Sequence, residues 1–139
     1  NVGVINKPIG RSHINRKKMA ISKRGKIALT KWRILDIYSP LASLLECQLE
    51  TGRTHQIRVH CSSIGHGVIG DNLYGKSFSK KNLKSSNDIE KLKLINLFDR
   101  QALHATQLCF RHPITNKYLE FVCSLPDDIM RLIKILKNN

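Results

Sequence analysis

The sequence predicts an α+β fold with a mixed, mainly antiparallel sheet and flanking helices. Three observations support it: short segments alternate apolar and polar residues as half-buried strands do, turn residues separate these segments, and two stretches carry apolar residues at helical spacing. The 139 residues suit one domain. No apolar run reaches the roughly 20 residues that a membrane-spanning helix needs, so we expect no membrane span.

The first two predicted strands occupy residues 26–38 and 43–50. The first is rich in β-branched and aromatic residues, and Ser39-Pro40 ends it. The second alternates and is predicted to pair antiparallel with the first. One of its faces carries Leu45, Cys47 and Leu49.

A helix is predicted directly after the Thr51-Gly52 turn. Thr54 has the side chain of an N-cap, and Gly65 supplies the stop. Between them, apolar residues follow at offsets of four and three, which is helical spacing. These residues are Ile57, Cys61 and Ile64.

The second half of the chain predicts further elements. Residues 65–75 hold four glycines and predict a loop with a short strand. Residues 76–99 are rich in Lys, Ser and Asn and predict an exposed insertion with some helix near 89–97. Residues 102–113 and 118–125 predict a hairpin. Asn116-Lys117 stands at its turn.

The last predicted element is a helix that begins at Pro126. Asp127 and Asp128 lie in its first turn and two lysines in its last, which suits the helix dipole. Its buried stripe is predicted to contain Ile129, Leu132, Ile133 and Leu136.

The charge is unevenly distributed. The formal net charge is +14, and residues 1–35 hold ten Lys or Arg and no acid. Residues 8–26 read as a basic loop or arm, because their few apolar residues have no helical period. Such a field attracts polyanions, with nucleic acid as the favoured partner. An anionic membrane surface and a solubilising surface are the alternatives.

The cysteines favour free thiols in a reducing cytosol. No two of the four lie at the spacing of a zinc knuckle, so no metal site is predicted. Each lies in an apolar or mixed segment, as buried thiols do. They are Cys47, Cys61, Cys109 and Cys123.

Residues 49–75 gather the polar groups that could carry chemistry. Arg53 and Thr54 lie at the predicted helix N-terminus, which favours a phosphate or a carboxylate. Arg58 lies one turn further on and can face the same pocket. The alternative interpretation is an ordinary N-cap with a surface ion pair between Arg58 and Asp71.

This segment resembles the RluA-type pseudouridine synthases, the group that includes RluA, RluC and RluD. The family pattern L-x-T-G-R-T-H-Q-I-R-x-H is matched at residues 49–60. G-H-P-I-x-G-D-x-x-Y-G is matched at residues 65–75, with Gly67 in place of Pro. Three further stretches, at residues 3–11, 100–113 and 125–129, resemble other family motifs.

The resemblance implies an isomerase that converts uridine to pseudouridine in structured RNA without a cofactor. Ribosomal RNA is the expected partner, and transfer RNA is also modified within the family. A family Asp attacks a flipped-out nucleotide, and the motif places its Arg partner at Arg58. The expected substrate-binding residues are Arg53, Thr54, His55, Gln56, His60, His66, Asp71, Tyr74 and His104. RNA phosphates are expected at Arg11, Arg16, Lys17, Lys18, Lys23 and Arg24.

The family's nucleophile motif has no counterpart in the sequence. None of the ten acids lies in an R-L-D-x-x-T-S-G context, and the family's pocket Tyr in K-x-Y-x-A-x-V-x-G is also missing. Residues 1–139 therefore read as the C-terminal portion of a synthase catalytic domain. We expect it to be inactive unless a separate N-terminal half supplies the Asp. The alternatives are a non-catalytic RNA-binding remnant and, more distantly, a basic ribosome-associated structural protein.

Two expectations follow for the chain as a whole. Such a half-domain exposes a sheet edge and part of its core, so it should be marginally stable alone and prone to associate. Its free thiols and RNA partner place it in the cytoplasm.

Overall fold

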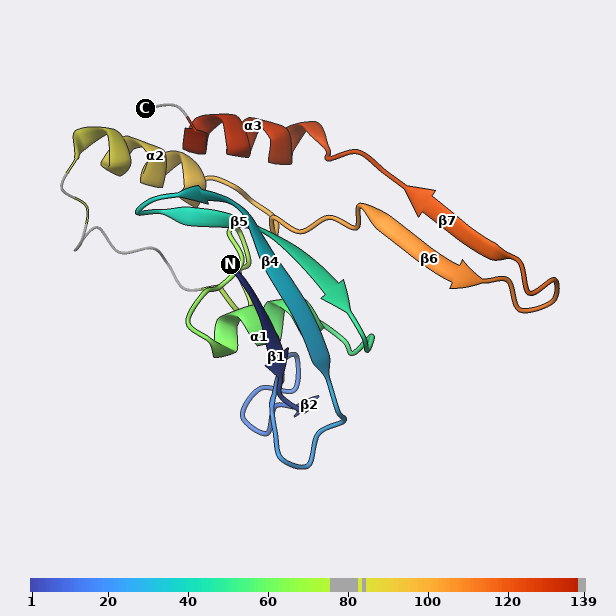
Figure 1. Cartoon of the computed structure of the whole chain (residues 1–139). Coiled ribbons are helices and arrows are strands. Elements are labelled where there is room, and N and C mark those ends of the chain that lie inside the picture. Colours follow the sequence, from blue (N-terminus) through green and yellow to red (C-terminus); the bar gives the residue numbers. More distant parts are fainter. Residues whose placement is uncertain (76–82, 84, 138–139) are drawn as a thin grey trace.

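The computed structural model describes residues 1–75, 83 and 85–137. It contains three small antiparallel sheets and three helices within those residues, shown in Figure 1. The predicted α+β class with mainly antiparallel strands is confirmed.

The central sheet has the order β1-β4-β5. Strand β4 (Leu29–Tyr38) pairs with β1 (Val2–Asn6) on one side and β5 (Ala42–Leu49) on the other, all antiparallel. The two strands predicted from the sequence are therefore confirmed, and the tight turn at Ser39-Pro40 joins them. Strand β1 was not predicted.

The basic segment is a hairpin rather than the loop or arm that we expected. Strand β2 (Ile9–Arg11) pairs antiparallel with β3 (Met19–Ile21), with Ile9 opposite Ile21. Ile9 is buried with Ala28 and Val59, and Met19 packs against the same cluster. Each strand is only three residues long, so a search for helical spacing or for long alternation misses the hairpin.

Helix α1 (Gln56–Ser63) lies against this sheet and hairpin, but Thr54 does not cap it. The N-cap residue is His55, in the left-handed conformation with φ 57°, and no side chain caps the helix. At the other end the predicted stop is confirmed, because Gly65 has φ +89° and its N–H donates to the Ser62 carbonyl at 3.1 Å. Residues 65–75 form turns without the short strand that we expected.

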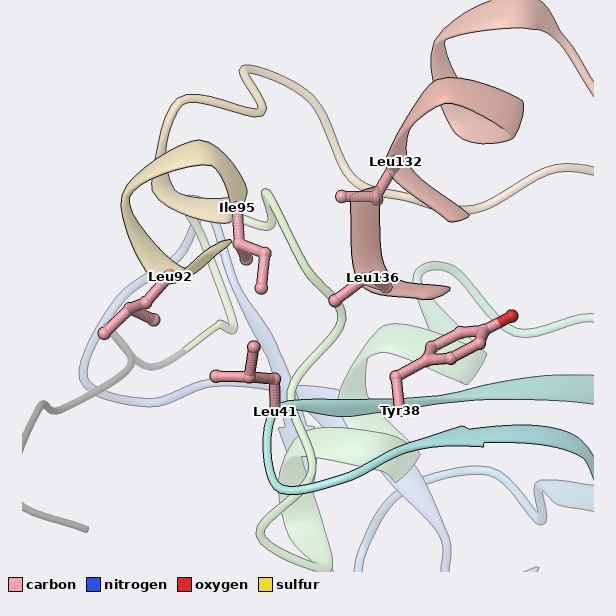
Figure 2. Close-up of a cluster of buried hydrophobic side chains, with 6 residues drawn as sticks. All are labelled: Tyr38, Leu41, Leu92, Ile95, Leu132 and Leu136. Carbon is pink, nitrogen blue, oxygen red and sulfur yellow. The ribbon is translucent and has the colours of Figure 1, made fainter. Parts of the chain in front are cut away.

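Helices α2 (Ser86–Asn96) and α3 (Asp127–Lys137) build the main core together with the β4–β5 turn. Figure 2 shows side chains of both helices converging on Leu41 and Tyr38. The predicted helix near 89–97 is confirmed as α2, but the expectation that this segment is simply exposed is wrong, since Leu92 and Ile95 are each only 2% exposed. Residues 76–82 and 84 of that predicted insertion lie outside the described residues. The predicted stripe of α3 is confirmed, with Ile129, Leu132 and Leu136 buried and Ile133 packed beside them.

The predicted C-terminal hairpin is confirmed as β6 (Gln107–Arg111) and β7 (Tyr118–Val122), with Asn116 at its turn in the left-handed region. Figure 1 shows that it extends away from the other elements. Nearly all of its strand residues are exposed, including Phe110 and Phe121, whose rings stack at 6.0 Å.

An open, largely apolar cavity of about 800 Å³ lies between the central sheet, α1 and α3. Its walls include Trp32, Leu45, Ile57 and Leu132. Among the described helices, none has both the length and the apolar character to cross a bilayer.

Candidate active site

The centre of the site is a buried ion pair between Arg58 on α1 and Asp71 in the following loop. Arg58 Nε donates to Asp71 Oδ2, and Nη2 donates to Oδ1, both at 2.7 Å. The Arg58 side chain is 14% exposed and that of Asp71 is fully buried. This is the pair named above as the alternative interpretation, but it is not a surface pair, because its carboxylate is enclosed and its guanidinium is mostly covered.

Asp71 also organises the loop that carries it. Its Oδ1 accepts the backbone N–H groups of Leu73 and Tyr74, each at 3.0 Å. Burial raises the pKa of the Asp71 carboxyl, but the hydrogen bonds from Arg58 and from these two N–H groups outweigh it and hold the pKa below its ordinary value. The same contact raises the pKa of Arg58. The pair is therefore ionised at neutral pH.

One edge of the Arg58 guanidinium remains open. A guanidinium carries five N–H donors in a planar fork, and Asp71 uses those on Nε and on one side of Nη2. Arg58 Nη1 has no hydrogen bond to the described residues, and it is not among their buried polar atoms that lack a partner. Among the described residues, Nη1 is thus a donor that the fold does not use, and a second anion is a chemically suitable partner for it.

Tyr74 and His55 complete the group around Arg58. The guanidinium carbon lies 4.9 Å from the centre of the Tyr74 ring, within cation–π range. The Tyr74 hydroxyl lies 2.9 Å from His55 Nδ1 and accepts the backbone N–H of Met19 at 2.8 Å. Four of the predicted site residues thus lie together: Arg58, Asp71, Tyr74 and His55.

Gln56 and His60 lie in the interior and use their polar atoms within the fold. Gln56 Oε1 accepts from Thr51 Oγ1 at 2.7 Å and from the Arg53 N–H at 3.0 Å. Its Nε2 donates to the Leu29 carbonyl and to Thr30 Oγ1, each at 3.0 Å. All four hydrogen-bonding positions of the amide are therefore occupied.

His60 extends the same buried network. It is 0% exposed and lies between Thr30 Oγ1 and the Lys7 carbonyl, each at 2.9 Å. A carbonyl only accepts, so His60 Nε2 carries a proton. With Gln56, His60 joins α1 to β1 and β4, which gives both residues a structural use that their motif position does not reveal.

The other predicted site residues lie apart from the Arg58 group. Arg53 Nε donates to the Ile27 carbonyl at 3.0 Å, and Thr54 is exposed. His66 is exposed and lines the apolar cavity. His104 is half-buried, and its Nε2 is buried without a hydrogen-bond partner among the described residues. None of these four side chains bonds to the Arg58 group within the described residues.

The predicted RNA-contacting residues gather on the β2–β3 hairpin and the turn after it. Five of them are exposed and one, Lys18, is half-buried. The tip is ordered, because Asn15 Oδ1 accepts the Lys17 N–H at 2.9 Å. The set comprises Arg11, Arg16, Lys17, Lys18, Lys23 and Arg24. In the part of the chain that the structure describes, no three His, Cys, Asp or Glu side chains form a metal site.

Two functional features escaped the sequence prediction. Thr30 within β4 and Thr51 after β5 bond to Gln56, and Thr30 also bonds to His60, but neither threonine carries a signal in the sequence beyond being a polar residue. The link between Tyr74 and Met19 joins residues 55 positions apart through a backbone N–H, which no side-chain pattern reports.

Comparisons with known proteins agree with the motifs. The profile of the RNA pseudouridylate synthase family matches residues 1–63. The ribosomal large subunit pseudouridine synthase D of Zymomonas mobilis is 47% identical over 138 residues, covering 96% of this chain and 40% of its own length. An uncharacterised RNA pseudouridine synthase of Bacillus subtilis, YlyB, is 42% identical over 137 residues and is covered to 40%. The chain thus spans about 40% of the length of these relatives.

Solved structures show the same likeness in the fold. The human RNA pseudouridylate synthase domain containing 4 superposes with a TM-score of 0.67 at 27% identity, covering 98% of this chain and 56% of that one. The human RNA pseudouridylate synthase domain containing 1 superposes with a TM-score of 0.63 at 25% identity and is covered to 60%.

Proposed function

The chain belongs to the RluA-type family of RNA pseudouridine synthases, and we propose that it forms the Arg58-containing part of a catalyst that isomerises uridine in ribosomal RNA. The observation that carries this proposal is the guanidinium of Arg58, which is anchored on Asp71 through Nε and Nη2, whereas its Nη1 bonds to none of the described residues. An isomerisation leaves the composition of the RNA unchanged, so the proposed reaction consumes no oxidant or reductant.

Arg58 acts in this proposal as the charge partner of a carboxylate nucleophile. A carboxylate in a closed pocket stays ionised only beside an opposite charge. The bidentate pair with Asp71 fixes the plane of the guanidinium and so aims its free donors. Asp71 itself is a poor nucleophile, because its two oxygens already accept four hydrogen bonds.

The nucleophile comes in this proposal from a second polypeptide segment that carries the R-L-D-x-x-T-S-G motif. No acid of the chain has that context. Two apolar surfaces support such a partner: the open cavity of about 800 Å³ and the exposed side chains of the β6–β7 hairpin. Exposed apolar patches mark interaction sites.

The basic hairpin holds the RNA backbone in this proposal. Its cations contribute affinity that is independent of sequence, and the pocket residues act on the target nucleotide. Gln56 and His60 support the pocket from inside, because their polar atoms already have protein partners. The free state of all four cysteines favours a reducing cytoplasm. The expectation that they are buried holds for Cys61 and is wrong for Cys109 and Cys123, which lie exposed on and beside the projecting hairpin.

Reconstitution tests the catalytic proposal. The chain is mixed with the part of the Zymomonas mobilis relative that it does not match, and pseudouridine is measured by nucleoside mass spectrometry after incubation with unmodified ribosomal or transfer RNA. We expect product only when both polypeptides are present, and with ribosomal RNA as the better substrate.

Arg58→Lys is the informative variant of this assay. Lysine keeps the charge next to Asp71 but lacks the planar fork, so the second anion loses its donors. We expect at least about a hundred-fold loss of rate, the scale on which a positioned charge contributes. Absence of product with the native pair, or an unchanged rate with Arg58→Lys, would count against catalysis.

A second candidate function is RNA binding without catalysis. The exposed cations of the β2–β3 hairpin favour it, and it needs no partner. In either function, RNA affinity should fall steeply with salt, by about 0.7–0.9 log units per log unit of salt for each phosphate contact. Lys17→Ala should lower that slope, whereas Lys93→Ala on the distant helix α2 should not. A flat salt response would remove the role of the hairpin in both functions.

A further inference from the structure

Tyr74 touches three separate parts of the site. Its hydroxyl bonds to the backbone of Met19 in the basic hairpin and to His55 at the start of α1, at 2.8 and 2.9 Å. Its ring lies against the Arg58 guanidinium, 4.9 Å from Cζ to the ring centre. One side chain therefore connects the hairpin, the helix N-terminus and Arg58.

Chemistry fixes the direction of one of the two hydroxyl bonds. The Met19 N–H only donates, so the hydroxyl oxygen of Tyr74 accepts it. The direction of the bond to His55 Nδ1 is set by which nitrogen of that ring carries the proton. In either case the hydroxyl is engaged by two protein groups.

The backbone of Tyr74 is held as firmly as its side chain. Its N–H donates to Asp71 Oδ1 at 3.0 Å, and its carbonyl accepts from Ser62 Oγ at 2.9 Å. The ring also packs against the small core of Ile9, Ala28 and Val59 beneath the hairpin. Tyr74 is thus a fixed support rather than a mobile contact.

We propose that Tyr74 is a positioning residue that holds the basic hairpin in a set place relative to Arg58. Its hydroxyl fixes the hairpin through Met19, and its ring fixes the guanidinium. RNA held by the hairpin cations is then delivered to the pocket at a constant geometry. The coupling, by which Tyr74 helps the hairpin deliver RNA to the pocket, rests on the proposed function. The attachment of the hairpin to Tyr74 through Met19 does not depend on that function.

Limited trypsin digestion tests the attachment in Tyr74→Phe, which keeps the ring and loses both hydroxyl bonds. We expect cleavage after Arg16 and Lys17 to quicken by roughly two- to ten-fold, the factor that one hydrogen bond gives. Cleavage after Lys117, in the distant β6–β7 turn, is the internal control and should stay unchanged. Mass spectrometry of the fragments identifies each cut.

The digestion separates local release from general loosening. Equal acceleration at Lys117 and at the hairpin would mean that the substitution destabilises the whole chain, and it would overturn the proposal. Unchanged cleavage at the hairpin would also overturn it, because the hydroxyl would then hold nothing.

RNA binding tests the coupling. The probe is a fluorescein-labelled RNA stem-loop with uridines in its loop, titrated at fixed salt and followed by anisotropy. Tyr74→Phe should weaken binding by roughly two- to ten-fold. In the Lys17→Ala/Lys18→Ala background, the same substitution should change affinity by less than about two-fold, because the hairpin no longer contributes.

Additive losses in that cycle, within about two-fold, would show that Tyr74 acts independently of the hairpin and would overturn the coupling. Failure of the wild-type chain to bind RNA would instead contradict the proposed function. The trypsin result would still decide whether Tyr74 holds the hairpin, so the two failures are distinguishable.

Discussion

At the scale of single residues, Arg58 illustrates how one side chain serves both stability and chemistry. Its Nε and Nη2 groups neutralise a fully buried carboxylate, whereas Nη1 bonds to none of the residues that the structure describes. A change that removes the guanidinium therefore strands Asp71 without a charge partner. Loss of activity in an alanine variant would mix this structural effect with any catalytic one, which is why a charged replacement is the better probe.

Arg58→Ala should lower the free energy of unfolding by about 3 kcal/mol or more, because it leaves a buried charge unpaired. The double variant Arg58→Met/Asp71→Asn should recover most of that loss, since it removes both charges together. Urea unfolding of dilute protein, followed by circular dichroism, measures both. A small effect of Arg58→Ala would mean that water solvates Asp71.

Asp71 also predicts how stability depends on acid. Its pKa is lowered in the folded state, so its contribution is complete above its unfolded value near 3.8 and is lost as the pH falls through the folded-state pKa. The free energy of unfolding should therefore fall in strong acid. Asp71→Asn should be less stable at neutral pH and should lack this part of the acid dependence. Parallel curves for the two proteins between pH 6 and the acid limit would contradict the assignment.

Gln56 and Thr54 form a matched pair of tests for the start of α1. Gln56→Leu removes four hydrogen bonds and leaves buried groups unpaired, so it should cost at least about 2 kcal/mol. Thr54→Ala should change stability by less than about 0.5 kcal/mol, because Thr54 is exposed and caps nothing. If Thr54→Ala lowered the free energy of unfolding by about 1 kcal/mol, Thr54 would be the N-cap of α1 as the sequence predicted.

At the scale of elements, helix α2 shows how composition misleads. The segment around it is rich in Lys, Ser and Asn, which suggests an exposed excursion. Its two buried residues nevertheless fill the space between α3 and the β4–β5 turn, as Figure 2 shows. Two apolar side chains at an offset of three are enough to anchor a short helix, and average composition hides them.

Ile95→Ala should destabilise the chain by about 2–5 kcal/mol, because it opens a cavity in the main core. Leu97→Ala, two residues on, should change stability by less than about 0.5 kcal/mol, since that side chain is 76% exposed. The melting temperatures of the two variants make the comparison. Equal shifts of the melting temperature in the two variants would show that α2 is an exposed insertion after all.

The paired strands show a similar limit. Alternation placed Leu45, Cys47 and Leu49 on one face of β5 and predicted the pairing with β4. The register shifts between Ile34 and Asp36, and Leu35 has no partner and is exposed. A bulge changes which face the following residues occupy, and no alternation pattern reveals where it lies.

At the scale of the whole molecule, two surfaces stand out. One is the basic β2–β3 hairpin, and the other is the β6–β7 hairpin with its exposed apolar side chains, which projects from the rest of the chain in Figure 1. The chain's charge of +14 opposes self-association, whereas its exposed apolar side chains favour it. A partner without excess positive charge can cover the exposed apolar side chains and is not repelled by the positive charge of the chain.

The isolated chain should therefore self-associate as its concentration or the salt rises, because salt screens the repulsion and leaves the apolar contacts. Phe110→Thr with Phe121→Thr should reduce this association without lowering the melting temperature, since both rings are on the exposed hairpin. Light scattering over a concentration series gives the measurement. A monomer at every concentration with cooperative, reversible unfolding would contradict the expected marginal stability.

Local patterns in the sequence determined the α+β class, strands β4 and β5, the glycine stop of α1, the stripe of α3 and the family. Each depends on residues close together in the chain or on a contiguous motif. Only the tertiary structure decided how the motif residues divide: Arg58, Asp71, Tyr74 and His55 meet, whereas Gln56 and His60 are enclosed. The physical reason is that the sequence shows which side chains can form hydrogen bonds but not with which partner. The partner of Tyr74, for example, is the backbone of Met19, more than 50 residues away, rather than a substrate.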